Sequence, residues 1–248
     1  MNKKWTIVEP ITEDEKKIFP ELDPVILQLL HNREVRTQED VDVFLGPDWH
    51  RDIHDPFLFT QMNEAVARVF AAFENEEVIT VHGDYDADGV CGSTVLVSTL
   101  RDIARKFDFD EKKINTYIPH REKEGYGISV TTIEHLHDHE KTNLVIAVDC
   151  GISNKDAIDR GKELGIDTII CDHHVMPKEL PEQAILIHSL VPGETYPNKH
   201  LCGTSVAFKF ASALIIDARK RGADLPEGHE KWLLDLVAIA TVTDMMPL

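Results

Sequence analysis

Three short apolar runs in this chain each end in residues that bind metal ions well. These runs and the residues that follow them are Val78–Val81 before Asp84, Asp86 and Asp88; Leu144–Val148 before Asp149; and Asp167–Cys171 before His173 and His174. Short apolar runs with polar boundaries predict buried β-strands. In open parallel sheets, ligands bind at the carboxyl ends of the strands. Carboxylates and imidazoles suit divalent ions of the Mn, Mg, Fe or Zn type. The pattern therefore predicts a metal-dependent enzyme that acts on phosphate esters.

The surrounding sequence alternates predicted strands with predicted helices. Strands are expected at 77–82, 114–118, 144–149, 167–172 and 184–188, and helices at 91–106, 129–138, 154–165, 203–221 and 231–242. Such alternation predicts an α/β fold with a mostly parallel five-stranded sheet flanked by helices. Residues 1–75 are expected to form a helical N-terminal leader, with helix starts at Asp23 and Thr37, and residues 76–248 to form the catalytic domain.

Composition limits the classes of protein that fit. A length of 248 residues and a hydrophobic content of 42% support one large or two small domains with a real core. The chain has no apolar run long enough for a membrane span and no signal peptide at Met1–Trp5, and its four cysteines form no CxxC pair, so we expect a cytoplasmic protein with no membrane partner. The net charge of −18 argues against a general nucleic-acid-binding surface. An anionic substrate would have to be held mostly by metal ions and a few placed cations.

The first motif is His82-Gly-Asp-Tyr-Asp-Ala-Asp-Gly89. Alternate residues of an extended segment point the same way, so the three aspartates are expected to converge, and a cation is the simplest relief of their repulsion. A calcium loop would need a glutamate at its twelfth position, which is Val95 when Asp84 is counted as the first. An aspartyl-phosphate phosphatase with Asp86 as nucleophile is a further alternative, but it gives the later histidine pair no role. A solvated turn is the simplest alternative of all.

Asp172-His173-His174 is the stronger motif, because two histidines follow an aspartate at a strand end. Adjacent residues of an extended segment project to opposite sides. We therefore expect His173 to bind the metal and His174 to contact the phosphate. Asp172 is expected to orient an imidazole through its second nitrogen.

Together these motifs resemble the DHH phosphoesterase superfamily and, within it, the RecJ-like exonucleases. The resemblance runs through nearly the whole chain and rests on the segments His82–Val90, Val148–Ser153, Asp172–His174, Thr243–Leu248, Tyr117–Arg121, Glu124–Gly127 and Leu201–Lys209, with Arg33, Phe44 and Asp55 in the leader. It implies a two-metal-ion phosphodiesterase, a 5′→3′ single-stranded DNA exonuclease acting in DNA repair and recombination. Two divalent metal ions about 4 Å apart, Mn²⁺ or alternatively Mg²⁺, would activate water and stabilise the leaving oxygen.

The resemblance also completes the set of expected site residues. The expected metal ligands are Asp84, Asp86, Asp88, Asp149, His173 and Asp244, with Asp149 bridging the two ions. Asp84 is alternatively a carboxylate that supports a ligand without binding an ion. Arg121 is expected to clamp a substrate phosphate, because guanidinium groups match phosphate oxygens. His82 is expected to be an additional ligand, a residue with a fixed tautomer that supports a ligand, or a substrate-binding residue. Single-stranded DNA is the expected partner, with a helicase or single-strand-binding protein as possible protein partners.

The chain departs from the RecJ-like pattern at Glu34, at His188-Ser189 and at Gly203-Thr-Ser205, the last of which is expected to stiffen a loop near the substrate. Its abrupt end after an apolar helical pattern favours a fragment of a longer protein, and the DHHA1 and OB-type domains are expected to be absent. Two other functions stay open. One is a hydrolase of short oligoribonucleotides, cyclic dinucleotides or pyrophosphate within the same superfamily, and the other is a non-catalytic DHH-like scaffold.

Overall fold

The computed structural model describes residues 6–247, and the chain divides into two compact units, Met1–His54 and Asp55–Leu248. Within its described residues, 6–54, the first unit contains four short helices: α1 (Glu13–Ile18), α2 (Pro24–His31), α3 (Gln38–Leu45) and α4 (Trp49–Asp52). Asp23 caps α2, and Thr37 forms a capping box with Asp40 at the start of α3, as the sequence predicts. The small apolar cluster of this unit consists of Ile11, Phe19, Leu27, Leu30 and Val41.

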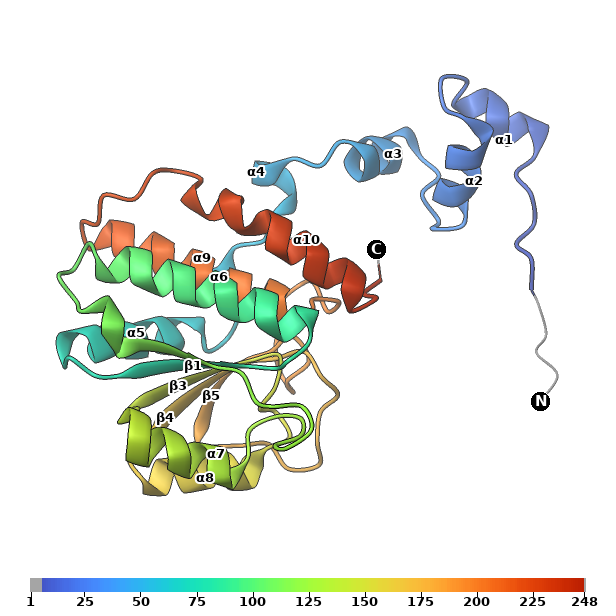
Figure 1. The fold of residues 1–248 in the computed structure, drawn as a ribbon. Helices are drawn as coiled ribbons and strands as arrows, with labels where there is room; N and C mark the ends of the chain where they lie inside the picture. Colours follow the sequence, from blue (N-terminus) through green and yellow to red (C-terminus); the bar gives the residue numbers. More distant parts are fainter. Residues whose placement is uncertain (1–5, 248) are drawn as a thin grey trace, which may run out of the picture. The chain divides into compact units, whose positions relative to one another are not determined.

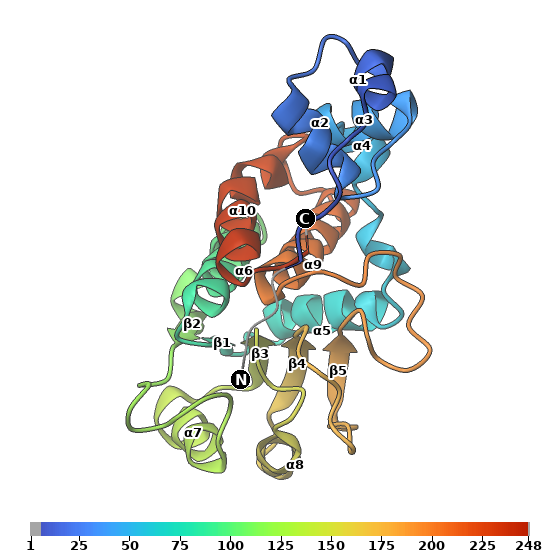
Figure 2. The same cartoon turned by 90° about the vertical axis from the view of Figure 1, so that its right-hand side faces the viewer.

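The second unit is built on a sheet of five parallel strands (Figure 2). The strands are β1 (Ile79–Gly83), β2 (Ile114–Tyr117), β3 (Leu144–Val148), β4 (Asp167–Cys171) and β5 (Ala184–Ile187). Their spatial order is β2-β1-β3-β4-β5. This confirms the predicted α/β class and the position of every predicted strand within a residue or two. All residues of β1 and β3 are buried, as expected for strands covered on both faces.

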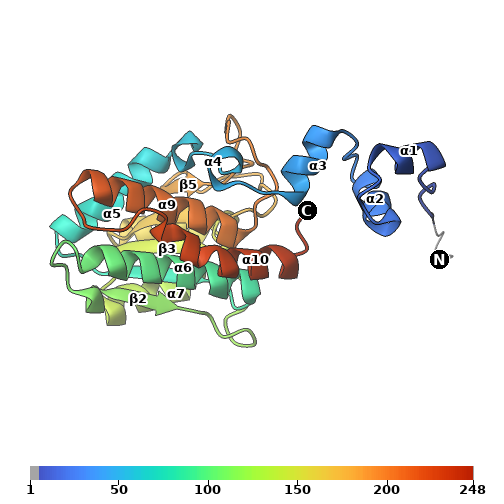
Figure 3. The same ribbon diagram turned by 90° about the horizontal axis from the view of Figure 1, so that it is seen from above.

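Helices cover both faces of the sheet (Figure 1). On one face lie α5 (Met62–Glu74), α6 (Ala87–Ala104) and α9 (Gly203–Lys220), and α10 (Leu234–Thr243) packs on α6 and α9 (Figure 3). On the other face lie α7 (Val130–His135) and α8 (Lys155–Glu163), which pack over an apolar cluster that includes Val145, Ala147 and Ile170. Single turns complete the unit: 3₁₀ turns η1 (Pro56–Leu58), η2 (Glu111–Lys113) and η4 (His229–Leu233), and the π-turn η3 (Leu136–Glu140).

The structural division differs from the division expected at residue 75. Helix α5 belongs to the unit that contains the sheet, because its apolar side chains, among them Val66, Val69 and Phe70, are buried there. The functional boundary at residues 75 and 76 stays a prediction. Within residues 6–247, no helix combines the length and the apolar character that a membrane crossing requires.

Candidate metal centre

The register of the sheet brings the strand ends to one level. Gly83 pairs with Val148, Val148 with Cys171, and Cys171 with Ile187. The residues that follow these four positions are therefore neighbours along one edge: Asp84, Asp149, Asp172 and His188. The chain leaves β1 toward β2 on one side, whereas β3, β4 and β5 lie on the other side. The gap between the ends of β1 and β3 is the topological switch point at which ligands bind in this class of sheet.

The aspartates of the first motif converge, but not through an extended segment. Asp86 is the N-cap of α6 and accepts hydrogen bonds from the backbone N–H groups of Asp88 and Gly89 at 3.0 and 3.1 Å. Helix α6 thus starts at Ala87, four residues before the predicted start, and Asp88 lies in its first turn. A side chain at Gly89 would come within 2.5 Å of the Asp84 backbone, so only glycine fits this tight strand-to-helix turn. The expectation of a shared extended geometry was wrong, although the three residues do gather at one site.

Their carboxylates form two acidic groups that meet at Asp149. Asp84, Asp86 and Asp149 offer oxygens within 4.8 Å of one another, and so do Asp88, His173 and Asp244 through their oxygens and ring nitrogen. A third group, which overlaps the other two, consists of Asp149, His173 and His174. His173 Nε2 lies 3.6 Å from Asp88 Oδ2, 3.5 Å from Asp244 Oδ2 and 3.2 Å from Asp149 Oδ1. Asp149 therefore belongs to the first group and lies beside the second through the His173 ring.

The groups are suited to cations because their buried atoms lack other partners. Asp84 Oδ1, Asp149 Oδ1 and His173 Nε2 are buried and make no hydrogen bond to any described residue. Burial, followed by the charge of Asp88, raises the pKa of Asp149 to about 10. Burial also raises the pKa values of Asp84 and Asp244. Hard carboxylate oxygens with one imidazole match divalent ions such as Mn²⁺.

Helix α9 fixes one of these carboxylates, which the sequence analysis did not foresee. The first N–H groups of α9, from Gly203 and Thr204, donate to the two oxygens of Asp88 at 2.7 Å each, and the Thr204 hydroxyl donates to the Asp88 carbonyl. Free N–H groups at a helix N-terminus favour a negative charge. A side chain at Gly203 would come within 2.6 Å of Asp149 Cβ. Residues 203–205 are thus a helix start in contact with the acidic groups, and the expected loop is not found there.

Asp172 organises the histidine pair. Its Oδ1 accepts hydrogen bonds from His173 N at 2.7 Å, His174 N at 3.2 Å and the His174 Nδ1 at 2.7 Å, while its Oδ2 accepts one from Ile152 N at 3.0 Å. Burial by itself raises the pKa of Asp172, but the His174 ring and these N–H groups outweigh burial and lower it. Asp172 therefore sits as a charged support under His174, in the orienting role that the sequence predicts for it.

The two histidines do not project to opposite sides. Their ring centres are 4.6 Å apart, and His174 Nδ1 lies 3.8 Å from Asp149 Oδ1. The extended-strand argument was wrong here, since β4 ends at Cys171 and the backbone bends at His174. Tyr126 joins this cluster by donating from its hydroxyl to the Asp149 carbonyl at 3.1 Å and by touching the His174 ring. The sequence analysis placed Tyr126 in a family segment but gave it no role.

The two expected substrate-binding residues lie in different surroundings. The Arg121 guanidinium is exposed and sits 4.9 Å from the ring centre of Tyr85, between Asp84 and Asp86 in sequence. His82 is fully buried, with its ring stacked on Tyr117 and its Nδ1 3.6 Å from Cys150 Sγ. Burial lowers the pKa of His82 to about 4. His82 has no exposed surface in this structure, so a contribution from it would act through its neighbours.

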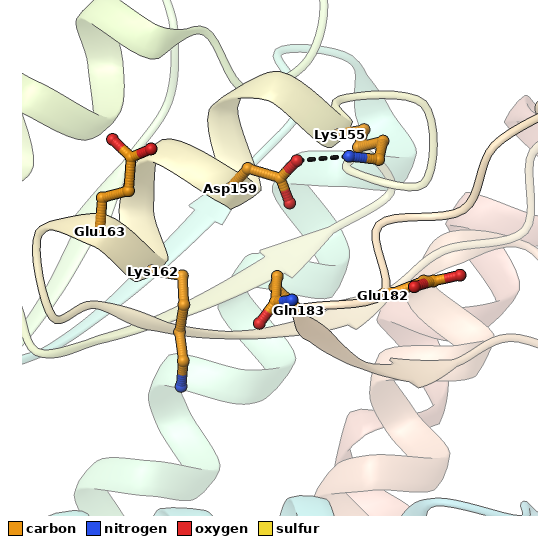
Figure 4. Close-up of a pocket in the computed structure, with 6 residues that line it drawn as sticks. All are labelled: Lys155, Asp159, Lys162, Glu163, Glu182 and Gln183. Atoms are coloured by element: carbon orange, nitrogen blue, oxygen red, sulfur yellow. Dashed lines mark hydrogen bonds and ion pairs between the residues drawn. The ribbon is translucent and has the colours of Figure 1, made fainter.

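Cavities elsewhere in the unit differ from this site. One of about 410 Å³ lies beside α8 and the segment before β5, and its lining is charged (Figure 4). Four of its five charged lining residues are in ion pairs: Lys155 with Asp159, Lys162 with Asp167, and Glu163 with Arg160. A cavity of about 260 Å³ instead adjoins the acidic groups and is lined by Tyr126, Asp172 and His174.

Comparison with known proteins supports the resemblance. The chain is 38% identical to the single-stranded-DNA-specific exonuclease RecJ of Bacillus subtilis over 99% of its own length and 29% of the relative's length. It is 30% identical to the protein of the same name from Escherichia coli over 95% of its own length and 40% of the relative's. The chain thus spans less than half the length of these curated relatives.

Solved structures agree with the fold. A crystal structure of exonuclease RecJ bound to manganese superposes with a TM-score of 0.62 and 32% identity, covering 77% of this chain and 44% of that one. RecJ of Thermus thermophilus in complex with Mn²⁺ superposes with a TM-score of 0.64 and 28% identity, covering 95% of this chain and 30% of that one. The family model described as "DHH family, N-terminal domain" matches residues 78–241, so this chain belongs to the DHH family.

Proposed function

We propose that this chain is the catalytic part of a metal-dependent phosphodiesterase that removes nucleotides from single-stranded DNA in the 5′→3′ direction. The observation that carries the proposal is the pair of acidic groups that meet at Asp149, with buried oxygen and nitrogen atoms that have no hydrogen-bond partner. The choice of single-stranded DNA rests on the names of the curated relatives. The direction, and a role in DNA repair and recombination, rest on the resemblance alone.

The residues at the strand ends would hold two divalent ions. Asp84 and Asp86 would hold one, Asp88, His173 and Asp244 the other, and Asp149 would bridge them. Bound there, two Mn²⁺ or Mg²⁺ ions would supply positive charge at both the attacking and the leaving oxygen of a phosphodiester. RecJ structures in complex with Mn²⁺ and with Mg²⁺ support this choice of ions. The N-terminus of α9 would hold Asp88 in place beside its group, because two backbone N–H groups bind its oxygens.

Other residues of the chain would bind and orient the substrate. His174 would contact the scissile phosphate, with its ring fixed by Asp172 at 2.7 Å. Arg121 would bind a further phosphate oxygen, since a guanidinium forms paired hydrogen bonds with phosphate. The 26 Lys and Arg residues of the chain are outnumbered by 44 Asp and Glu residues, so few phosphates should be neutralised and binding of DNA should depend only weakly on salt.

The expected surroundings of this enzyme follow from the same observations. The four cysteines are free thiols, which supports a reducing compartment such as the cytoplasm. Single-stranded DNA is the proposed partner, while a helicase or single-strand-binding protein stays a prediction. No observation favours the smaller-substrate hydrolase or the scaffold over the exonuclease, and all the ligands that a scaffold could lose are present.

Hydrolysis of labelled oligonucleotides tests the proposal. The chain is incubated with Mn²⁺ and a short single strand labelled at either end, next to a duplex and an RNA of the same sequence. We expect single nucleotides to leave the 5′ end of the single-stranded DNA, with little product from the duplex and none in the presence of a chelator. Hydrolysis that persists in chelator would contradict the metal dependence, and preference for RNA would favour the alternative substrate class.

A further inference from the structure

His188 follows directly after β5 and is fully buried at the level of Asp84, Asp149 and Asp172. Its two ring nitrogens each have a partner. The Leu190 N–H donates to Nδ1 at 3.1 Å, and Nε2 lies 3.0 Å from the carbonyl oxygen of His174. Because a backbone N–H can only donate, Nδ1 must accept, and the ring proton must be on Nε2. The Nε2–H of His188 therefore donates to the His174 carbonyl.

This hydrogen bond acts on a segment that no helix or strand continues. Strand β4 ends at Cys171, and Val175, directly after the motif, is 85% exposed. The backbone of His174 is consequently oriented by side chains. Asp172 binds its N–H, and His188 binds its carbonyl. Rotation of the peptide planes on either side of a residue redirects its side chain, so both contacts bear on where the His174 ring points.

We propose that His188 is a positioning residue for the reaction, which holds the His174 imidazole in place through the His174 carbonyl. The proposal rests on the proposed function, in which His174 contacts the scissile phosphate. His188 itself touches neither of the acidic groups in the described contacts, so it should affect turnover while leaving metal affinity unchanged. Second contacts of this kind around a metal site typically change activity by about 10–100-fold when they are lost.

Two substitutions separate the effects of the two hydrogen bonds of His188, because each keeps one bond and loses the other. In His188→Gln, the longer side chain brings its NH₂ group to the position of Nε2, so the bond to the His174 carbonyl is kept. In His188→Asn, the shorter side chain brings its oxygen to the position of Nδ1, so the bond from Leu190 N–H is kept and the bond to His174 is lost. Both variants introduce a polar amide at the same buried site, which makes each the control for the other.

Nuclear magnetic resonance of histidine rings, recorded without metal or substrate, provides the first readout. We expect His188 to show the Nε2–H tautomer, and the His174 ring signals to shift in His188→Asn and to stay in place in His188→Gln. Unmoved His174 signals in His188→Asn would overturn the positioning role, whatever the activity of the protein. If His174 moves as expected but the wild-type chain hydrolyses no phosphodiester, the proposed function fails and the positioning role stands.

Hydrolysis kinetics with Mn²⁺ and a short single strand provide the second readout. We expect kcat to fall by about tenfold or more in His188→Asn and to be largely kept in His188→Gln, with KM and Mn²⁺ affinity unchanged in both. In a His174→Ala background, His188→Asn should cause no further fall, because it acts through the residue that is already removed. Equal losses of kcat in the Gln and Asn variants, or an undiminished loss in the His174→Ala background, would show that His188 only stabilises the fold.

Discussion

The two edges of the sheet both gather carboxylates, but among the described residues only the amino edge pairs them with lysine and arginine side chains. At the amino edge, Asp167 opens β4 and binds Arg68 at 2.7 Å and Lys162 at 2.8 Å, and Arg68 also binds Glu77 at 2.6 Å. At the carboxyl edge, Asp149 follows β3, and its Oδ1 has no hydrogen-bond partner while other carboxylates surround it. The nearest basic group to that oxygen is a histidine.

The contrast extends to the ionisation of the two carboxyl groups. Burial raises the pKa of Asp167, but Lys162 and Arg68 outweigh burial, and the pKa is lowered. The pKa of Asp149 is raised to about 10, first by burial and then by Asp88. A buried carboxylate without a counter-charge costs stability. The amino edge is therefore a structural network, whereas the carboxyl edge is arranged for a cation that the protein itself does not supply.

Neutralising one carboxylate at each edge tests this difference most directly and should give the largest effect. Asp149→Asn should lower Mn²⁺ affinity and hydrolysis by more than about 100-fold, the upper end of what loss of an outer-shell partner costs. Asp167→Asn should leave both unchanged. Calorimetry with Mn²⁺ and the oligonucleotide assay measure the two effects.

Unfolding in urea without metal gives an independent check on the same pair. Asp149→Asn should raise the free energy of unfolding of the metal-free protein, because the amide is neutral at this buried site whereas the carboxyl group must take up a proton on folding. Asp167→Asn should lower it, because Arg68 and Lys162 lose their partner. Undiminished Mn²⁺ binding by Asp149→Asn would contradict the bridging role of Asp149. A higher free energy of unfolding in Asp167→Asn would show that the two edges do not differ as described.

Within the carboxyl edge, the two histidines should separate metal binding from turnover. His173→Ala should lower both Mn²⁺ affinity and kcat, because Nε2 of His173 lies among Asp88, Asp149 and Asp244. His174→Ala should lower kcat by about 10²–10³-fold, the usual cost of removing one hydrogen-bond donor to the transition state, with a smaller loss of Mn²⁺ affinity. Since His174 also approaches Asp149, equal losses of metal affinity in both variants would make His174 a ligand.

The comparison also explains what the sequence could predict. The strands were predictable because apolar runs such as Leu144–Val148 are buried on both faces and end in polar residues. That the carboxylates gather at one edge followed from the parallel order of the strands. The geometry of the first motif was not predictable in this way, because Asp86 caps α6 and turns Asp88 into a helix. Local extended geometry was the wrong assumption for that segment.

Contacts between distant segments account for the rest. The hydrogen bonds from Gly203 and Thr204 to Asp88 join residues more than a hundred positions apart, and no pattern within either segment predicts them. The hydroxyl of Tyr126 and the ring of His188 reach the same cluster from still other segments. The strand ends of a parallel sheet identify the edge of the site, but the residues that support its ligands come from the packing of loops and helices over that edge.

The pH dependence of stability should differ between the two edges in the metal-free protein. For Asp149, the folded-state pKa of about 10 exceeds its ordinary value of 3.8, so its stabilising contribution is full below about pH 4 and is lost as the pH rises toward 10. For Asp167, the pKa is lowered from 3.8, so its contribution is full above about pH 4 and is lost as the pH falls.

Urea unfolding across a series of pH values measures both the fall in stability above about pH 4 and the fall below it. Asp149→Asn should flatten the fall in stability between about pH 4 and pH 10. Asp167→Asn should flatten the fall in stability below about pH 4. Saturating Mn²⁺ should act on the wild type as Asp149→Asn does, because it keeps the carboxylate ionised in the folded state. If neither Asp149→Asn nor saturating Mn²⁺ changes the fall in stability as the pH rises, Asp149 is not the group that titrates in that range.

The smallest expected effect concerns the stacking of Arg121 on Tyr85 near the carboxyl edge, where the guanidinium carbon lies 4.9 Å from the ring centre. A cation–π contact at an exposed site is worth about 0.5–1 kcal/mol, which corresponds to a rise in KM of about 2–5-fold when the ring is removed. Tyr85→Leu should cause this rise, and Tyr85→Phe should not, because it keeps the ring. The effect of Tyr85→Leu should vanish in an Arg121→Gln background if the ring acts by holding the guanidinium.

Arg221, which stacks on Phe70 at 4.1 Å at the far end of α9, is the matched control, and Arg221→Gln should leave KM unchanged. A rise in KM of the same size in Tyr85→Phe would assign the effect to the Tyr85 hydroxyl, and a rise in Arg221→Gln would mean that cations outside the carboxyl edge also hold the DNA.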